Sequence, residues 1–151
     1  MRIVIVFLLL VSMNAQAEEV WGFLPMTSIH FRHSKDGTDL KHKGGDTNEA
    51  NYGLGIQVRR DNQDSINVGA YRNSFYRDSQ YALYGFNLGV REWRSITFRA
   101  EFMAGLITGY SHEHDPSVYA APVGSIEYRN WGVSALWVPS VVVAFGLKYR
   151  F

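Results

Sequence analysis

The chain has 151 residues, a length that suits one folded domain. It contains no cysteine, so stability must come from packing or from the closure of a sheet rather than from disulfides. The formal net charge of +1 says little about partners, and we expect no nucleic acid among them. Aromatic residues make up 15% of the chain and glycine is frequent, a composition shared by membrane barrels and soluble β-sandwiches.

The first 17 residues have the parts of a secretory signal peptide. Met1 and Arg2 form a short positive region, residues 3–13 are almost entirely apolar, and Ala15-Gln16-Ala17 is a small-x-small cleavage pattern. The apolar run is shorter than the about 20 residues that a membrane-spanning helix needs. We therefore expect a signal peptide over residues 1–17 and a single exported domain over residues 18–151, made by a Gram-negative bacterium.

Strict alternation of apolar residues predicts strands along the rest of the chain. Residues 52–59, 82–90 and 96–105 each place apolar side chains at every second position, with mostly small, polar or charged residues between them. The cleanest alternation is the last segment, residues 141–151. Its apolar face ends in Tyr149 and Phe151, and its other face ends in Lys148 and Arg150.

The connections between these strands are of two kinds. Short turn signals occur at residues 61–64, 92–94 and 129–131, whereas residues 35–49 and 111–117 are long and polar. Short periplasmic turns and long extracellular loops are typical of outer-membrane barrels. Counting the segments gives about eight strands, a number whose interior just admits side chains or one small ligand. We expect an all-β fold, an eight-stranded antiparallel transmembrane β-barrel of the outer membrane.

Alternation alone does not separate a barrel from a soluble sandwich. A sandwich buries its apolar face and exposes its polar face to water, whereas a membrane barrel turns its apolar face outward to lipid and its polar face inward. The predicted signal peptide, the absence of cysteine and the aromatic chain end favour the barrel. A chain that ends on an outward-facing Phe151 resembles the assembly signal of outer-membrane proteins. We therefore expect the outer-membrane assembly machinery as a partner, and a monomer as the assembled state.

Several collinear groups of residues resemble one family. Ile29-His30-Phe31-Arg32 is similar to a His-x-Arg pattern near the outer end of the family's first strand, and Asn48-Glu49 before the glycines at 53 and 55 is similar to the approach to its second. Residues 71–75 fall where the family has an Asp-Ser pair, and Tyr84-Gly85-Phe86 follows at the family's spacing. Pro122 and Pro139 are 17 residues apart (139 − 122), as two family prolines are, and residues 122–128 look similar too. The set resembles the PagP family of outer-membrane lipid A palmitoyltransferases over most of the mature chain.

This resemblance implies an eight-stranded barrel with a lipid-accessible interior pocket. Members of the family move a palmitoyl chain from a glycerophospholipid of the outer leaflet to a hydroxyl group on an acyl chain of lipid A. Gly85 would line the floor of the acyl pocket and limit chain length, and Pro122 and Pro139 would interrupt strand hydrogen bonding so that lipid enters sideways. The implied partners are membrane phospholipid and lipopolysaccharide, and we expect no cofactor.

Acyl transfer to a hydroxyl group needs a base and donors for the developing oxyanion. His30 is the best candidate base, because alternation with Ile29 turns its side chain inward. We expect Ser74 to supply a hydroxyl group in the site and Asn73 to orient it or to donate to the oxyanion. Strict alternation points Asn73 inward and Ser74 outward, so a break in the strand near the rim is needed to turn Ser74 toward His30.

The chain departs from the family at two places. The residues between Ala17 and Thr27 are too few for the amphipathic helix that usually precedes the family's first strand. Asn73 stands where the family has aspartate, and an amide neither carries charge nor acts as a base. The second departure leaves another interpretation open, a catalytically silent outer-membrane barrel that binds lipid, modifies the surface or excludes phage. A narrow porin ranks third, because the lumen is crowded.

Two further polar groups are predicted to have no catalytic role. Arg99 and Glu101, together with Arg59 and Glu127, are expected to fill the base of the barrel as a structural network. Residues 112–115, His-Glu-His-Asp, offer metal-ligand types. They lie in an exposed loop with too few fixed ligands, and we expect no metal site there.

Overall fold

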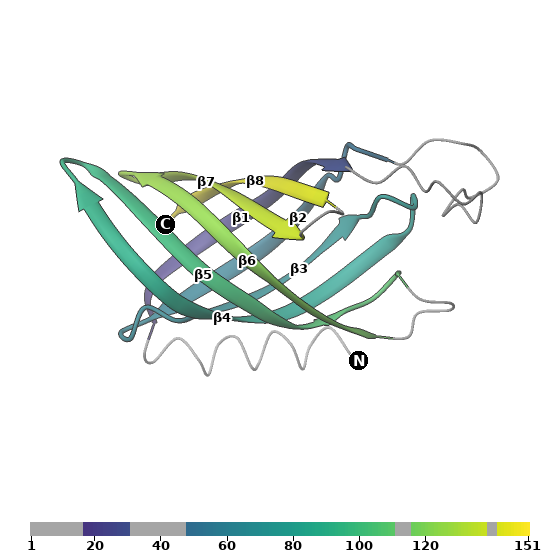
Figure 1. The fold of residues 1–151 in the computed structure, drawn as a ribbon, viewed down its shortest axis with the longest axis horizontal. Helices are drawn as coiled ribbons and strands as arrows, with labels where there is room; N and C mark the ends of the chain where they lie inside the picture. The colour runs from purple at the N-terminus through teal and green to yellow at the C-terminus, as the bar shows by residue number, and fades with distance from the viewer. Residues whose placement is uncertain (1–16, 31–47, 111–115, 139–141) are drawn as a thin grey trace.

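Eight antiparallel strands close into a barrel in which each strand pairs with its neighbours in chain order (Figure 1). The structure is a computed structural model, and it describes residues 17–30, 48–110, 116–138 and 142–151. The strands are β1 (Ala17–His30), β2 (Gly53–Arg60), β3 (Ser65–Arg72), β4 (Asp78–Trp93), β5 (Ile96–Ile107), β6 (Ser117–Tyr128), β7 (Trp131–Val138) and β8 (Val142–Arg150). The predicted all-β, eight-stranded antiparallel barrel is confirmed.

The start of the chain bears on two of the predictions. Residues 1–16 of the predicted signal peptide lie outside the described residues, and Ala17 is the first residue of β1. Residues 17–27 belong to β1 itself, so they do not form the amphipathic helix that the resembling family has there. Among the described residues, no helix has the length and apolar character needed to cross a membrane.

The two ends of the barrel differ in their connections. One end, the terminal rim, holds the start of β1, the end of β8 and the short turns at residues 61–64, 94–95 and 129–130. These turns overlap the predicted ones, although residues 92–93 belong to β4 and Trp131 to β7. The other end, the distal rim, holds the end of β1 and the turn at residues 73–77. At the terminal rim the hairpin of β4 and β5 projects beyond its neighbours (Figure 1).

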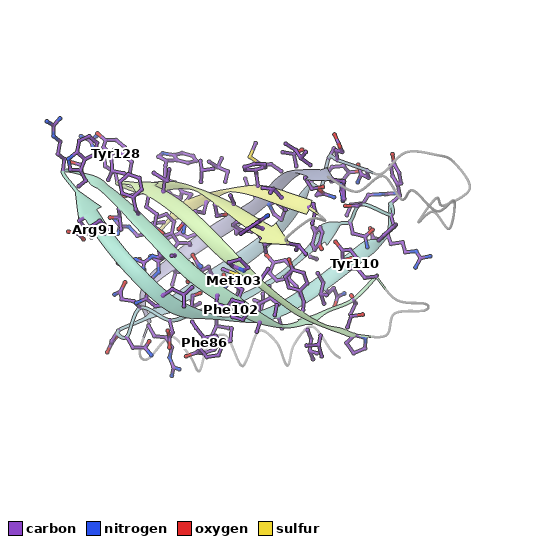
Figure 2. The ribbon with its side chains drawn as sticks, viewed as in Figure 1. Phe86, Arg91, Phe102, Met103, Tyr110 and Tyr128 are labelled. Atoms are coloured by element: carbon purple, nitrogen blue, oxygen red, sulfur yellow. The ribbon has the colours of Figure 1, made fainter. Side chains whose placement is uncertain are left out.

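Alternation along the strands sorts side chains between the lumen and the outside surface, here called the outer wall. On β5, Arg99 and Glu101 are buried in the lumen, whereas Phe98 and Phe102 are exposed. On β8, Lys148 is buried and Tyr149 is exposed. Phe86 projects from the outer wall in Figure 2. The predicted faces of residues 96–105 and 142–151 are therefore confirmed.

A β-bulge overturns the predicted alternation of residues 82–90. The register of β4 against β5 shifts between Asn87 and Gly89, so Leu88 is an extra residue. Beyond it, Val90 pairs with the lumen-facing Arg99 instead of continuing the outer apolar face. The predicted alternation of residues 82–90 therefore fails at Val90, because an unpaired residue reverses the two-residue period of a strand.

A second bulge lies in β1, where the register against β8 shifts between Pro25 and Thr27. Proline has no N–H to donate to a ladder, so it fits at such an interruption. The bulge lets Trp21 near one rim and His30 near the other face the same lumen, although their numbers differ in parity.

The terminal half of the lumen is filled by ions around Glu127. This carboxylate accepts hydrogen bonds from Arg59 Nη2 at 2.9 Å and Lys148 Nζ at 2.6 Å, and lies 3.5 Å from Arg99 Nε. Trp21 is fully buried beside it, with the cationic groups of Arg59 and Lys148 at 5.5 and 4.8 Å from its ring centre. The predicted structural network at the base is confirmed.

An apolar section follows toward the distal rim. Leu83, Met103 and Val123 form its buried core, and Tyr81, Tyr119 and Leu136 pack around them. A Cβ atom at either Gly55 or Gly69 would overlap the hydroxyl of Tyr81. These two glycines therefore make the space in which the Tyr81 ring crosses the lumen.

The turn between β2 and β3 is fastened to β4 by Asp64. Its carboxylate accepts hydrogen bonds from the backbone N–H of Asn87 and the hydroxyl of Tyr84, both at 2.8 Å. These donors hold the pKa of Asp64 below its usual range.

We expect Glu127→Gln to lower the free energy of unfolding and so to unfold at a lower urea concentration than the wild type. The substitution leaves three buried cations without their shared anion, and breaking a buried ion pair costs about 3–5 kcal/mol. Urea unfolding followed by tryptophan fluorescence measures the loss. Glu92→Gln, the same change at an exposed position of β4, is the control and should differ little from wild type. Equal unfolding midpoints for the two variants would contradict the structural role of the network.

Candidate functional site

A short segment at the distal rim joins the end of β1 to the β3–β4 turn. This segment, Asn48–Asn51, is called the rim bridge below. The backbone N–H of Ser28 donates to the carbonyl of Glu49 at 3.0 Å, and the N–H of Asn48 donates to the carbonyl of Ser74 at 2.9 Å. The Asn48 amide also donates to the carbonyl of Asn73 at 3.2 Å. The rim bridge therefore ties the strand that carries His30 to the turn that carries Ser74.

A break of the kind that an inward Ser74 requires is present near the end of β3. The strand ends at Arg72, and the chain turns through residues 73–77, with the N–H of Asn73 donating to the carbonyl of Arg77 at 2.8 Å. The exposed fractions of Asn73 and Ser74 are 0% and 7%, so both side chains are buried. The turn thus removes the conflict between an inward Asn73 and an outward Ser74.

All the hydrogen-bonding groups of the Asn73 amide are used within the protein. Its nitrogen donates to Ser79 Oγ and to the carbonyl of Gly109, both at 2.9 Å. Its oxygen accepts from the N–H groups of Phe75 and Arg77 at 2.9 and 3.0 Å. An asparagine amide has two donors, and both are occupied, so this geometry favours a structural role in the turn.

His30 faces the lumen, as predicted, at the last position of β1. It pairs with Val142 of β8, and its Nδ1 atom is buried with no hydrogen-bond partner among the described residues. Ser28, two positions earlier on the same face, is likewise buried, and its hydroxyl also lacks a partner there. His30 and Ser74 belong to the same rim, but no hydrogen bond between the described parts of the chain joins their side chains.

Tyrosines line the distal half of the lumen beside this site. The hydroxyl groups of Tyr71 and Tyr110 are 2.7 Å apart, and Phe75 packs edge-on against Tyr110 with ring centres at 5.8 Å. Figure 2 places Tyr110 at the end of the barrel opposite to Arg91 and Tyr128. The mouth of the lumen is therefore aromatic and carries polar hydroxyl groups.

Gly85 lies in the lumen at the boundary between the apolar section and the ion network. A Cβ atom there would overlap Ser65 Oγ and come within 3.1 Å of Glu101 Oε1. The Ser65 hydroxyl donates to that same carboxylate oxygen at 2.7 Å. Leu83, the next lumen-facing residue of β4, belongs to the apolar core. Gly85 thus marks the depth at which the apolar section ends.

Pro122 lies where one of the strand ladders stops. β6 pairs with β5 along its whole length, including Pro122 with Phe102, but it pairs with β7 only from Val123 and Leu136 to the terminal rim. Within the described residues, positions 121 and 122 of β6 therefore have no ladder to β7, although β7 remains paired with β8 as far as Val138. Pro139, the second predicted proline, lies outside the described residues.

The outer wall is hollowed just on the terminal side of this gap. A cavity of about 730 Å³ lies over small outward-facing residues that neighbour one another across the strands. They are Gly89, Ala100, Gly124 and Ala135. The bulge at Leu88 supplies Gly89 to this row, so the hollow is a consequence of that irregularity.

Sequence reasoning missed one polar residue of this region. Asn51 of the rim bridge is buried, and its amide donates to the carbonyls of Asn48 and Arg72 at 3.3 and 3.2 Å. Its only sequence signal was a polar residue directly before an apolar strand, which usually indicates a turn. The His-Glu-His-Asp segment lies outside the described residues, and within the described ranges no three His, Cys, Asp or Glu side chains gather closely enough to hold a metal ion.

Compared with models of known protein families and with curated proteins, the sequence matches none.

We expect Asn73→Asp to destabilise the β3–β4 turn. A carboxylate would place an oxygen where the amide now donates to the Gly109 carbonyl, and an unpaired buried polar group costs about 1–3 kcal/mol. Thermal unfolding in detergent measures this loss. Asn130→Asp is the control, because that exposed amide donates to one carbonyl at the terminal rim and the change should cost much less. An Asn73→Asp barrel as stable as the wild type would show that the amide donors are dispensable.

Proposed function

We propose that this chain is an outer-membrane acyltransferase that moves a fatty acyl chain from a glycerophospholipid to lipid A or a related lipid. The observation that carries the proposal is the gap between β6 and β7 beyond Pro122, next to an apolar section of the lumen that ends at Gly85. An open sheet edge facing lipid is costly unless it is used. A gap beside an apolar lumen suits the lateral entry of an acyl chain.

An outer-membrane location is supported by the inverted arrangement of side chains. The outer wall exposes large apolar residues on several strands, among them Leu54, Phe86, Leu106 and Trp137, whereas the lumen buries Arg59 and Glu127. Soluble monomers rarely expose apolar surface on this scale. Exposed aromatic residues also gather near the terminal rim, as in the girdles of membrane barrels. They are Trp93, Tyr128, Trp131, Tyr149 and Phe151.

The aromatic residues at the end of β8 and just after it support the proposed recognition by the outer-membrane assembly machinery. Phe151 is exposed, its N–H donates to the carbonyl of Val20 at 3.1 Å, and its ring packs edge-on against Tyr149. The terminal aromatic ring is thus presented on the outer wall. In the assembled barrel it would lie at the periplasmic interface.

In this proposal His30 is the general base. Among the described residues it is the one imidazole, and its buried Nδ1 has no hydrogen-bond partner there. It would take the proton of the acceptor hydroxyl group as that oxygen attacks the ester carbonyl of the donor lipid. The ester C–O bond then breaks, and the imidazolium would return the proton to the glycerol oxygen of the departing lysophospholipid. Ser74 would lie beside the reacting groups, held there by the rim bridge. The hollow over Gly124 would guide an acyl chain toward the gap at Pro122.

Mass spectrometry of lipid A tests the proposal, using cells that lack their own palmitoyltransferase and that express this barrel. We expect a mass increase of one acyl chain. His30→Ala should reduce the product about a hundredfold or more, the usual contribution of a general base, and Ser74→Ala should also reduce it. Ser95→Ala, the same change in an exposed turn at the terminal rim, is the control. Unchanged lipid A from a folded, heat-modifiable barrel would argue against the transfer.

Gly85→Met tests whether Gly85 limits the acyl chain. The added side chain overlaps Ser65 and must turn into the apolar section, so we expect a shorter acyl chain on the product. Ala82→Met is a matched control on the same strand, because Ala82 is exposed on the outer wall away from the hollow. If both variants transfer the wild-type chain length, the acyl chain does not reach Gly85.

A second candidate function is a catalytically silent barrel that binds lipid or alters the cell surface. The fully occupied amide of Asn73 favours it, because a structural Asn73 leaves no acidic partner for His30 at that position. A folded barrel that retains phospholipid yet leaves lipid A unchanged would identify this second function.

A further inference from the structure

Three buried polar atoms near the distal rim have no hydrogen-bond partner among the described residues. They are Ser28 Oγ, His30 Nδ1 and Asn51 Oδ1. Ser28 and Asn51 are only 3% and 5% exposed. Leaving a buried polar atom unpaired is destabilising, and such atoms in native proteins call for an explanation. Three at one rim point to a ligand that satisfies them.

Backbone hydrogen bonds connect the elements that carry these atoms. Ser28 and His30 are on the same lumen-facing side of β1, two residues apart. The N–H of Ser28 is bonded to Glu49, and the amide of Asn51 folds back onto Asn48, both in the rim bridge. The same rim bridge contacts Ser74 through Asn48. The unpaired atoms thus belong to the proposed active-site end of the lumen.

The chemistry of the three atoms defines the ligand. Asn51 Oδ1 only accepts, an imidazole nitrogen accepts when unprotonated, and a serine hydroxyl both donates and accepts. A ligand that donates hydrogen bonds and also accepts one would satisfy the three atoms. Alcohol hydroxyl groups can both donate and accept. A quaternary ammonium or an amine oxide headgroup offers no such donor.

We propose that Ser28 and Asn51, together with His30, form a subsite that binds a hydroxyl-bearing headgroup of the acyl acceptor, such as a sugar. The subsite deepens the proposed function and rests on it. Ser28 is here a positioning residue that holds the acceptor hydroxyl group for His30. Asn51 holds a neighbouring hydroxyl group and so contributes to the choice of acceptor.

Binding of a simple probe tests the subsite without requiring catalysis. The folded full-length barrel in lauryldimethylamine oxide micelles is titrated with n-octyl-β-D-glucoside while the ring nitrogen signals of His30 are followed by NMR. We expect the wild type to show a saturable shift. Ser28→Ala should weaken the apparent affinity about three- to tenfold, the effect of one hydrogen bond, and Ser28→Thr should restore it.

Thr27→Ala is the matched control, since Thr27 is the neighbouring hydroxyl residue of β1 but is exposed on the outer wall. It should bind the glucoside as the wild type does. Ser28→Ala should fold at least as stably as wild type, because it removes an unpaired hydroxyl group. A purely structural Ser28 would instead give a less stable barrel with unchanged affinity. Equal affinity of Ser28→Ala and wild type overturns the proposal.

Kinetics separate this inference from the proposed function. If acyl transfer occurs, Ser28→Ala should raise KM for the acceptor about three- to tenfold, whereas Thr27→Ala should leave that KM unchanged. Transfer with an unchanged acceptor KM overturns the subsite and leaves the function standing. A glucoside shift that Ser28→Ala weakens, in a barrel that transfers nothing, rejects the transferase and retains the subsite.

Discussion

The buried carboxylate of Glu127 is the interaction on which the interior depends. It lies among Arg59, Arg99 and Lys148, which come from three other strands of the barrel. Isolated cations in such a place would be prohibitively costly, so the geometry of this one anion fixes how β2, β5, β6 and β8 meet. Trp21, packed against the same cations, brings β1 into the arrangement.

The ion network also limits how far the apolar section of the lumen extends toward the terminal rim. Because Ser65 and Glu101 hydrogen-bond to each other beneath Gly85, apolar groups are accommodated only on the distal side of that level. The lumen is consequently divided into a charged base, an apolar middle and an aromatic, polar mouth. In a barrel whose interior just admits side chains, this division decides where a ligand chain could end.

The sequence was sufficient for those features that follow from local periodicity. Eight strands, the short turns of the terminal rim and the ionic base were all predicted, because each depends on alternation or on charge at a lumen-facing position. The two bulges were not predicted, since an extra residue such as Met26 or Leu88 looks like an ordinary strand residue. The outward turn of Gly89 and the hollow above it depend on the second bulge, so they too were beyond the sequence.

In the candidate site, too, the features that follow from local alternation were predicted and those that depend on distant contacts were not. His30 was placed in the lumen by alternation with its neighbours, and the break that buries Ser74 was anticipated from a conflict of parity. The long-range bonds of the rim amides were not anticipated, because Asn48 donates to a carbonyl 25 residues away and Asn73 to one 36 residues away, in addition to their local bonds.

The structural role of Asn73 in the β3–β4 turn changes what its departure from the PagP pattern indicates. An asparagine whose four hydrogen bonds hold a turn has a sufficient reason to be there without catalysis, so its amide gives no support to activity. The unpaired atoms of Ser28, His30 and Asn51 have no such structural reason. A rim whose described residues leave three buried polar atoms unpaired, while they satisfy the asparagine turn completely, is better explained by a ligand than by folding.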